Sequence, residues 1–248
     1  MERVGSLRFI WRLVALLGHV LIGALITLVL MILRRLGLSW PALPPIVQWW
    51  HRRAVRLLGL RLQVSGEPLP GAALLVANHI SWLDIPALGA VRQMAFLSKS
   101  EVRRWPLVGW MAEFAGTLFI ERGSNQSEQV RDAIRGRLEQ GGQVVFFPEG
   151  TTTDGSDVRR FHPRLFAAAQ QSVAPLQPVS LRYLPAPGRA SVAPFIGDDE
   201  LMPHLLRVLK EPWITVEIRF LPALDAGEMD RKSLAERTRS SIRESLGL

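Results

Sequence analysis

The sequence from residue 73 to residue 84 reads ALLVANHISWLD, and this stretch decides the fold. Its first five residues are apolar and predict a buried strand over Ala73–Ala77. His79 and Asp84 follow that strand, and Pro86 allows a helix to begin. Because α/β sheets carry their reactive groups at the carboxyl ends of strands, this is a place where catalytic residues are expected. A histidine held in one tautomer by a carboxylate is a general base, and the alternative is that Asp84 merely caps the helix.

After about residue 61, short apolar runs alternate with amphipathic segments, which is typical of an α/β domain. We expect a mixed β-sheet flanked by helices. The further runs predicted as strands are Leu60–Val64, Ala95–Ser98, Thr117–Ile120, Gln143–Phe147, Leu176–Arg182, Ser191–Phe195 and Trp213–Phe220. The predicted helices are Asn125–Gln140, with Asn125 and Glu128 as a capping pair, Arg160–Gln171, Asp199–Lys210 and Asp230–Glu244.

The N-terminal segment has the composition of a membrane anchor. Leu13–Leu33 carries no charged residue and, as a helix, is long enough to cross roughly 30 Å of hydrocarbon. A cleaved signal peptide is the alternative, but the run is too long and is followed by Arg34 and Arg35 instead of a small-residue cleavage site. Ile46–Leu60 mixes apolar and basic residues, which suits a helix lying in the headgroup layer.

These two segments predict that residues 1–60 are membrane-attachment helices and that residues 61–248 form the catalytic domain. We expect the helices to form a membrane-embedded hairpin that enters and leaves one leaflet. The alternative is a single span followed by a proline-rich linker.

The net charge of +8 and the sequence pI of about 11.1 suit an anionic partner, such as a bilayer surface, an acidic carrier protein, a nucleotide-bearing donor or nucleic acid. Nucleic acid is not expected, because the basic residues are scattered and no aromatic residues are interleaved with them. The absence of cysteine excludes disulfides, thiolate catalysis and cysteine-ligated zinc. With no Walker loop, Gly-x-Gly-x-x-Gly or His-Glu-x-x-His motif, we expect neither a metal nor a bound cofactor.

Three further segments carry polar groups beside apolar runs. Gly116–Arg122 reads as a strand that ends in an arginine suited to an anion, although a solvated arginine is the simpler alternative. Phe147–Thr151 also follows a strand, where Glu149 is an acceptor and Gly150 lets the backbone approach a ligand. Val173–Val179 carries prolines, which more often mark an edge or a bulge than a binding wall.

The order and spacing of these blocks resemble the lysophosphatidic-acid acyltransferases and their relatives in the glycerolipid acyltransferase superfamily. The matching blocks are Asn78, His79 and Asp84; Gly116, Phe119, Ile120 and Arg122; Phe147–Thr151; and Pro175–Val179. Together they span about residues 73–181.

The resemblance implies that His79 and Asp84 form a catalytic dyad, that Arg122 holds the acceptor headgroup, and that Glu149 and Gly150 line its pocket. It also implies attachment to the cytoplasmic leaflet of the inner membrane. The remaining residues expected at the substrate site are Asn78, Lys99, Thr151 and Thr152.

The expected reaction is acyl transfer from a thioester to a hydroxyl of a lysolipid. A hydroxyl is a poor nucleophile at neutral pH, so a neutral imidazole must take its proton. With no cysteine and no Gly-x-Ser-x-Gly elbow, direct transfer is simpler than a covalent acyl-enzyme. The donor, acyl-CoA or acyl carrier protein, is a substrate, and the expected partners are membrane lipids, the lysolipid acceptor and, for one donor, the carrier protein.

The expected acceptor is 1-acylglycerol-3-phosphate, which would be converted to phosphatidic acid in phospholipid biosynthesis. Phosphatidic-acid-forming relatives usually have arginine where this chain has Thr152, so a lyso-ornithine lipid or another lysolipid is the alternative acceptor. Arg159 or Arg160 is placed to replace the missing basic group. A thioesterase or lipid hydrolase is the rival enzyme class, and a catalytically silent membrane or nucleic-acid binder is the second rival.

Overall fold

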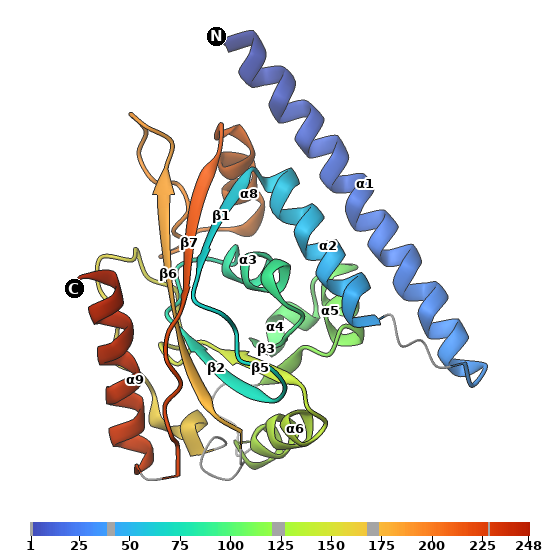
Figure 1. Cartoon of the computed structure of the whole chain (residues 1–248). Coiled ribbons are helices and arrows are strands. Elements are labelled where there is room, and N and C mark those ends of the chain that lie inside the picture. Colours follow the sequence, from blue (N-terminus) through green and yellow to red (C-terminus); the bar gives the residue numbers. More distant parts are fainter. Residues whose placement is uncertain (1, 39–42, 121–126, 168–173, 228) are drawn as a thin grey trace.

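The computed structural model describes residues 2–38, 43–120, 127–167, 174–227 and 229–248. At its centre lies a seven-stranded sheet of order β1-β7-β6-β2-β5-β3-β4 (Figure 1). The strands are β1 (Leu60–Ser65), β2 (Ala73–Ala77), β3 (Ala95–Lys99), β4 (Leu118–Ile120), β5 (Gln143–Phe146), β6 (Leu176–Pro185) and β7 (Ile214–Phe220). Strands β6 and β7 pair antiparallel and the other neighbours pair parallel, so the predicted mixed sheet is confirmed.

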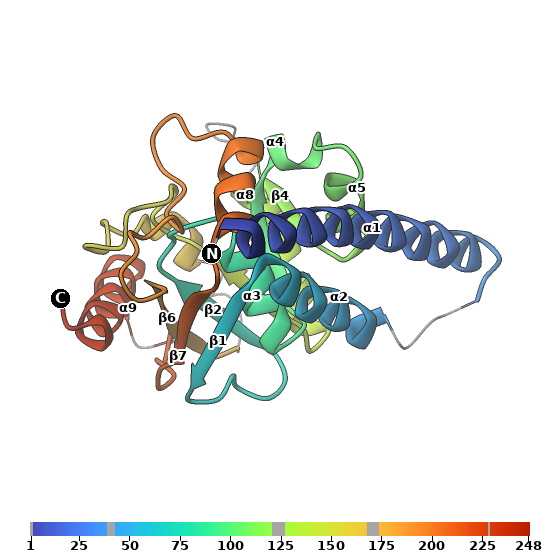
Figure 2. The same ribbon diagram turned by 90° about the horizontal axis from the view of Figure 1, so that it is seen from above.

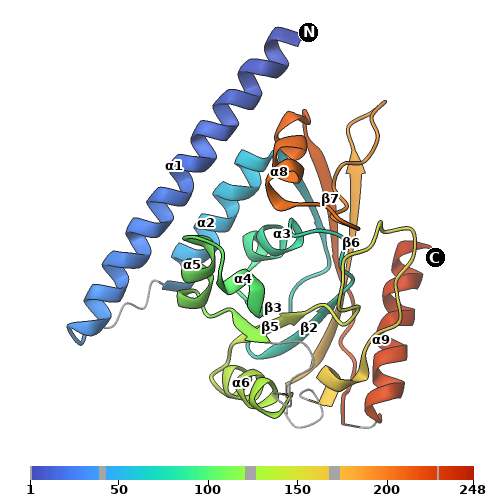
Figure 3. The same cartoon turned by 180° about the vertical axis from the view of Figure 1, so that it is seen from behind.

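The central strand β2 is buried on both faces, as its continuous apolar run predicts. Leu75 and Ala77 belong to the apolar core on one face of the sheet, and Leu74 and Val76 belong to the core on the other face. Helices α2, α3 and α8 contribute to the first core, and α6 and α9 contribute to the second (Figures 1 and 3). The helices are α1 (Glu2–Arg35), α2 (Leu43–Leu58), α3 (Asp84–Val91), α4 (Ser100–Arg103), α5 (Val108–Phe114), α6 (Ser127–Glu139), α8 (Leu201–Lys210) and α9 (Arg231–Leu246), with a 3-10 turn η1 (Pro163–Phe166).

The long helix α1 lies along the outside of the domain, and α2 returns antiparallel beside it (Figures 1 and 2). Within α1, a stripe at helical spacing is buried against the protein: Arg12, His19, Gly23, Thr27 and Leu30. The other faces expose large apolar side chains along the whole helix, from Leu7 to Ile32. The apolar window within Gly5–Arg35 is long enough to cross a membrane by length and composition. Helix α1 therefore presents an extended apolar surface on one side of the α/β domain.

Most predicted elements are present, with boundaries shifted by a few residues. The predicted strand over Ser191–Phe195 is wrong: this segment is an irregular loop, whose Phe195 N–H donates to the carbonyl of Ile80 at 3.0 Å. Ala193 is buried in the same apolar core as Leu75 and Ala77, and Val192 packs against that core, so burial of this segment does not depend on a sheet partner. Only η1 and Ala167 represent the helix predicted over Arg160–Gln171 among the described residues, and residues 168–173 lie outside them.

The prolines of the Val173–Val179 segment also occupy an unexpected position. Strand β6 lies between β7 and β2 and not at an edge of the sheet. Pro178 is paired with Val76 in parallel register, and its carbonyl accepts from Leu221 N at 3.0 Å. The capping pair predicted for α6 is not tested, because Asn125 lies outside the described residues.

Candidate active site

His79 and Asp84 form a hydrogen-bonded pair at the carboxyl end of β2. The Nδ1 atom of His79 lies 2.7 Å from Oδ2 of Asp84. The imidazole keeps 20% of its surface exposed, whereas the Asp84 carboxylate is fully buried. Because Nδ1–H donates to the carboxylate, Nε2 is the ring atom left to take a proton. The predicted base and its partner are therefore in contact. Asp84 is the first residue of α3 and its side chain makes no capping hydrogen bond to that helix, so the capping alternative is wrong.

The tight turn after β2 satisfies the buried Asp84 carboxylate with backbone donors. Oδ2 also accepts from the N–H groups of Ile80 at 2.9 Å and Ser81 at 3.1 Å. A buried ionised carboxylate is tolerated when several donors surround it. The spacing of five residues between His79 and Asp84 lets the chain turn back, so that the carboxylate contacts both the imidazole and the loop backbone.

The backbone of His79 is held from both sides by the Phe147–Thr153 segment. Its N–H donates to Oε1 of Glu149 at 2.7 Å, and its carbonyl accepts from Thr153 N at 2.9 Å. The other carboxylate oxygen, Oε2, accepts from Arg159 N at 2.9 Å. Burial raises the pKa of Glu149, and hydrogen bonds from the His79 and Arg159 backbone oppose that shift. Glu149 is thus occupied with the backbone of two loops.

An aromatic side chain covers one side of the imidazole. The ring of Phe147 stacks on His79 with a centroid separation of 4.1 Å and an interplanar angle of 16°. Gly150 follows in the left-handed region, with φ of 70°, which explains the glycine at this turn. Thr151 and Thr152 are half-buried, and the Thr152 hydroxyl donates to the carbonyl of Phe195. This bond ties the Phe147–Thr153 segment to the loop that replaces the predicted strand.

The other predicted substrate residues occupy different positions. Lys99 is exposed at the carboxyl end of β3. It lies at the same end of the parallel strands as His79, but two strands away. Arg122 lies outside the described residues. Asn78 is buried, and its amide makes two hydrogen bonds to the backbone of Leu181, at 2.9 Å and 2.8 Å. The Asn78 amide therefore continues the pairing of β2 with β6 beyond the end of β2.

Two residues of the site do not follow from the catalytic motifs. The hydroxyl of Tyr183 on β6 donates to Oδ1 of Asp84 at 2.7 Å. His204 on α8 accepts from Nε1 of Trp82 at 3.0 Å and donates through Nε2 to the Pro194 carbonyl at 3.1 Å. Burial lowers the pKa of His204, in keeping with a neutral ring that accepts at one nitrogen and donates at the other. In the sequence, the signal that could have pointed to Tyr183 is its spacing: it follows Val179 and Leu181 at every second residue, which places the one tyrosine of the chain on the core-facing side of β6.

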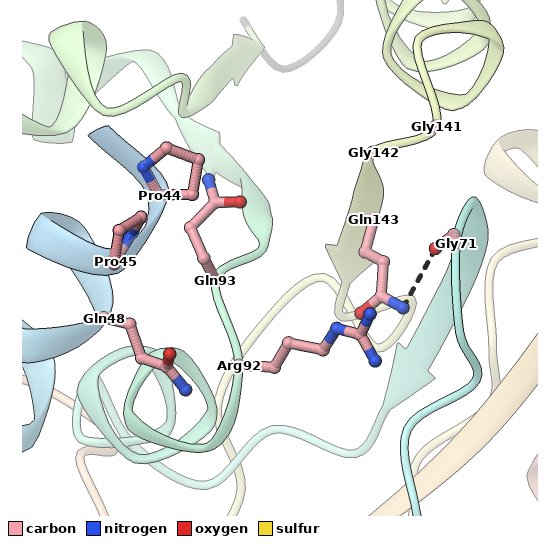
Figure 4. A pocket seen from close by; sticks show the side chains of 9 residues that line it. All are labelled: Pro44, Pro45, Gln48, Gly71, Arg92, Gln93, Gly141, Gly142 and Gln143. Atoms are coloured by element: carbon pink, nitrogen blue, oxygen red, sulfur yellow. Dashed lines mark hydrogen bonds between the residues drawn. The ribbon is translucent and has the colours of Figure 1, made fainter. Parts of the chain in front are cut away.

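Two hollows lie away from the dyad. One, of about 320 Å³, is lined by Gly71, Gln143, Gln48, Arg92 and their neighbours (Figure 4). Gln143 begins β5 and Gly71 precedes β2, so this hollow lies at the amino ends of these strands, whereas His79 follows the carboxyl end of β2. The other, of about 380 Å³, lies between α2, β1 and the end of α3. Among the described residues, no three His, Asp or Glu side chains gather to hold a metal ion.

Comparisons with known proteins show which family the chain resembles. The family model described as Acyltransferase matches residues 61–182, which include the dyad and the Phe147–Thr151 block. A lyso-ornithine lipid O-acyltransferase from Pseudomonas aeruginosa is 40% identical over 98% of this chain and 95% of its own length. A 1-acyl-sn-glycerol-3-phosphate acyltransferase from Neisseria gonorrhoeae is 36% identical over 75% of this chain and 74% of its own length.

The fold also has a solved counterpart. The crystal structure of a 1-acyl-sn-glycerophosphate acyltransferase from Thermotoga maritima superposes with a TM-score of 0.68. It covers 100% of this chain and 99% of that chain at 21% sequence identity, so it supports the fold alone. Because the family model matches and a relative of near-equal length is 40% identical, the chain belongs to the acyltransferase family and is an acyltransferase.

Proposed function

We propose that this enzyme transfers a fatty acyl group from a thioester to a hydroxyl of a lysolipid at a membrane surface. The observation that carries the proposal is the 2.7 Å contact between Nδ1 of His79 and Asp84, which leaves Nε2 available on a partly exposed ring. In the reaction, Nε2 takes the hydroxyl proton as the oxygen attacks the thioester carbonyl. The carbon–sulfur bond then breaks, and the protonated imidazole returns the proton to the leaving thiolate.

Direct transfer fits the surroundings of the imidazole. Among the described residues, no serine or threonine hydroxyl is hydrogen-bonded to the His79 ring, whose polar partner is Asp84. The nearest serine in sequence, Ser81, has a buried hydroxyl with no hydrogen-bond partner. A covalent acyl-enzyme of the serine type requires a hydroxyl in contact with the base. A hydrolase that uses the same dyad with water as acceptor is the competing class.

Two acceptors are consistent with the site, 1-acylglycerol-3-phosphate and a lyso-ornithine lipid. A phosphomonoester carries between one and two negative charges near neutral pH and is best held by paired basic groups. Thr152 instead donates its hydroxyl to Phe195 O, so this position contributes no charge. The backbone N–H of Arg159 donates to Glu149, which also accepts from the backbone N–H of His79. Arg159 therefore lies near the dyad in space and could supply one basic group to the acceptor headgroup. The likeness over almost the full length to the lyso-ornithine lipid enzyme supports the second acceptor.

The helical pair supplies the attachment that a lipid substrate requires. The exposed apolar faces of α1 would enter the bilayer, and the exposed Arg52, Arg53 and Arg56 of α2 would lie at anionic headgroups. A catalytic domain on the cytoplasmic side of the inner membrane would meet acyl-CoA or acyl carrier protein there. A lysolipid could then reach His79 without leaving the membrane surface.

The test is an activity assay of the detergent-purified protein with one labelled acyl thioester and a panel of lysolipids. We expect label in a diacyl lipid product, with 1-acylglycerol-3-phosphate and a lyso-ornithine lipid as the leading acceptors. Release of free fatty acid at a comparable rate without any acceptor would instead favour the hydrolase. The ratio of the two leading rates ranks the acceptors.

A further inference from the structure

We infer that Tyr183 is a positioning residue for acyl transfer, which orients the Asp84 carboxylate so that Asp84 can orient His79. This inference rests on the proposed function of the dyad. Tyr183 is the only tyrosine in the chain, and its hydroxyl reaches Oδ1 of Asp84 at 2.7 Å from a strand 99 residues away in sequence. Tyr183 would therefore act through Asp84 and would not touch the substrate.

The division of hydrogen bonds at Asp84 gives the tyrosine a distinct task. Oδ2 accepts from His79 and from two backbone N–H groups, whereas the partner of Oδ1 is Tyr183. Without the hydroxyl, Oδ1 would be a buried carboxylate oxygen with no donor among the described residues, because Asp84 has no exposed surface. Such an oxygen would turn toward another donor, and that movement weakens the alignment of the imidazole.

The tyrosine hydroxyl is a dependable donor in this position. Burial raises the pKa of Tyr183 well above its ordinary value, and the nearby Asp84 charge raises it further. The hydroxyl thus stays protonated across the working pH range. The ring itself belongs to the apolar core with Val179 and Leu181, so its direction is fixed by packing.

Asn78 fixes the register that lets the tyrosine reach the dyad. Its amide pairs with both backbone groups of Leu181, two residues before Tyr183. Because every second residue of a strand points to the same face, these two hydrogen bonds also fix the position of Tyr183 along β6 relative to Asp84. Asn78 and Tyr183 therefore act together to hold Asp84 in place.

The decisive variant is Tyr183→Phe, which keeps the ring and removes the hydroxyl. We expect kcat to fall about tenfold with both KM values within about twofold of wild type. The acid limb of kcat/KM against pH should move upward by about half to one pH unit, because a less compensated carboxylate holds the protonated imidazole more tightly. The matched control is Ser180→Ala, which removes a buried hydroxyl on the same strand that pairs with Ser245 at 2.8 Å. The control should leave the pH profile unchanged.

The single tyrosine allows a second test that leaves the hydroxyl in place. Growth on 3-fluorotyrosine labels position 183 alone, and its more acidic phenol is a stronger donor. The acid limb should then move downward in pH, opposite to the Phe variant. A wild-type pH profile in both the Phe variant and the fluorinated protein would overturn the inference. If instead His79→Ala and Asp84→Asn retain activity, the proposed function itself fails, whatever Tyr183 does.

Discussion

The Oε1 atom of Glu149 accepts a hydrogen bond of 2.7 Å from the backbone N–H of His79, which lies 70 residues earlier in the chain. Glu149 is almost fully buried, and both of its oxygens accept backbone N–H groups. The residue that family resemblance places in the substrate pocket therefore also fixes the loop that carries the base. This double attachment makes the stability of the site depend on the ionisation of one carboxyl group.

Replacement of Glu149 by Gln should change how stability depends on pH. Burial raises the pKa of Glu149 above its ordinary 4.5, so the folded protein binds this proton more tightly than the unfolded chain does. The contribution of the group to the free energy of unfolding is therefore largest below pH 4.5 and is lost as the pH rises through the raised pKa. Glu149→Gln cannot titrate, so the wild-type advantage over the variant should shrink with rising pH.

Urea unfolding in detergent, between pH about 4 and about 7, measures this difference. Glu113→Gln is the control, since Glu113 is exposed in a surface ion pair with Arg103 and should change little. A difference between wild type and Glu149→Gln that stays constant with pH would contradict the proposed linkage.

The dyad was predictable from the sequence because its two residues are only five positions apart. The apolar run of β2 fixed their place at a strand end, and the spacing fixed the turn. Tyr183 and the Phe195 loop were not predictable, because their contacts with Asp84 and Ile80 join segments that are about 100 residues apart in the chain. Local patterns carry no information on which distant strand faces a given turn.

The strand predicted over Ser191–Phe195 failed for a similar reason. Its apolar residues are typical of a strand, but Pro194 accepts from His204 and the Phe195 N–H bonds Ile80, so backbone groups are satisfied by loops and a helix. Once these groups have partners, no sheet pairing is required.

Arg12 should be the main anchor of the N-terminal helix. Its guanidinium is buried and donates to the carbonyls of Glu211 at 2.6 Å and Pro212 at 2.9 Å, just after α8. Arg12→Ala leaves those carbonyls without a donor, so we expect the free energy of unfolding to fall by about 2 kcal/mol. Arg8→Ala is the matched control, because Arg8 makes one exposed bond to the Lys210 carbonyl and should cost well under half as much. Equal losses in thermal or urea unfolding would contradict the assignment.

The protein should fractionate with membranes and be released by detergent but not by salt. The apolar side chains along α1 are exposed to water in the part of the chain that the structure describes, whereas charge attraction is screened beyond about 10 Å at 0.1 M salt. Sedimentation of washed membranes in 1 M salt and in detergent distinguishes the two modes. Complete release by salt would show that the basic surface is the true attachment.

Thr152→Arg tests the headgroup position. The new arginine gives up the hydrogen bond to the Phe195 carbonyl and brings a second basic group toward the acceptor. We expect transfer to 1-acylglycerol-3-phosphate to rise several-fold relative to a lyso-ornithine lipid. The same assay on Arg159→Ala tests whether Arg159 supplies the positive charge that binds the phosphate headgroup. If the wild type already strongly prefers the phosphate acceptor and Thr152→Arg does not increase it, the position does not discriminate.

The most direct test of the account follows one labelled acyl thioester on wild type, His79→Ala and Asp84→Asn. With wild type, no label should stay on the protein before a lysolipid is added, and diacyl lipid should then form. Both variants should fold normally and lose about 10³-fold or more of this transfer, because each removes the base or the carboxylate 2.7 Å from it. A stoichiometric acyl-protein adduct, or near wild-type transfer by either variant, would contradict direct transfer by the His79–Asp84 pair.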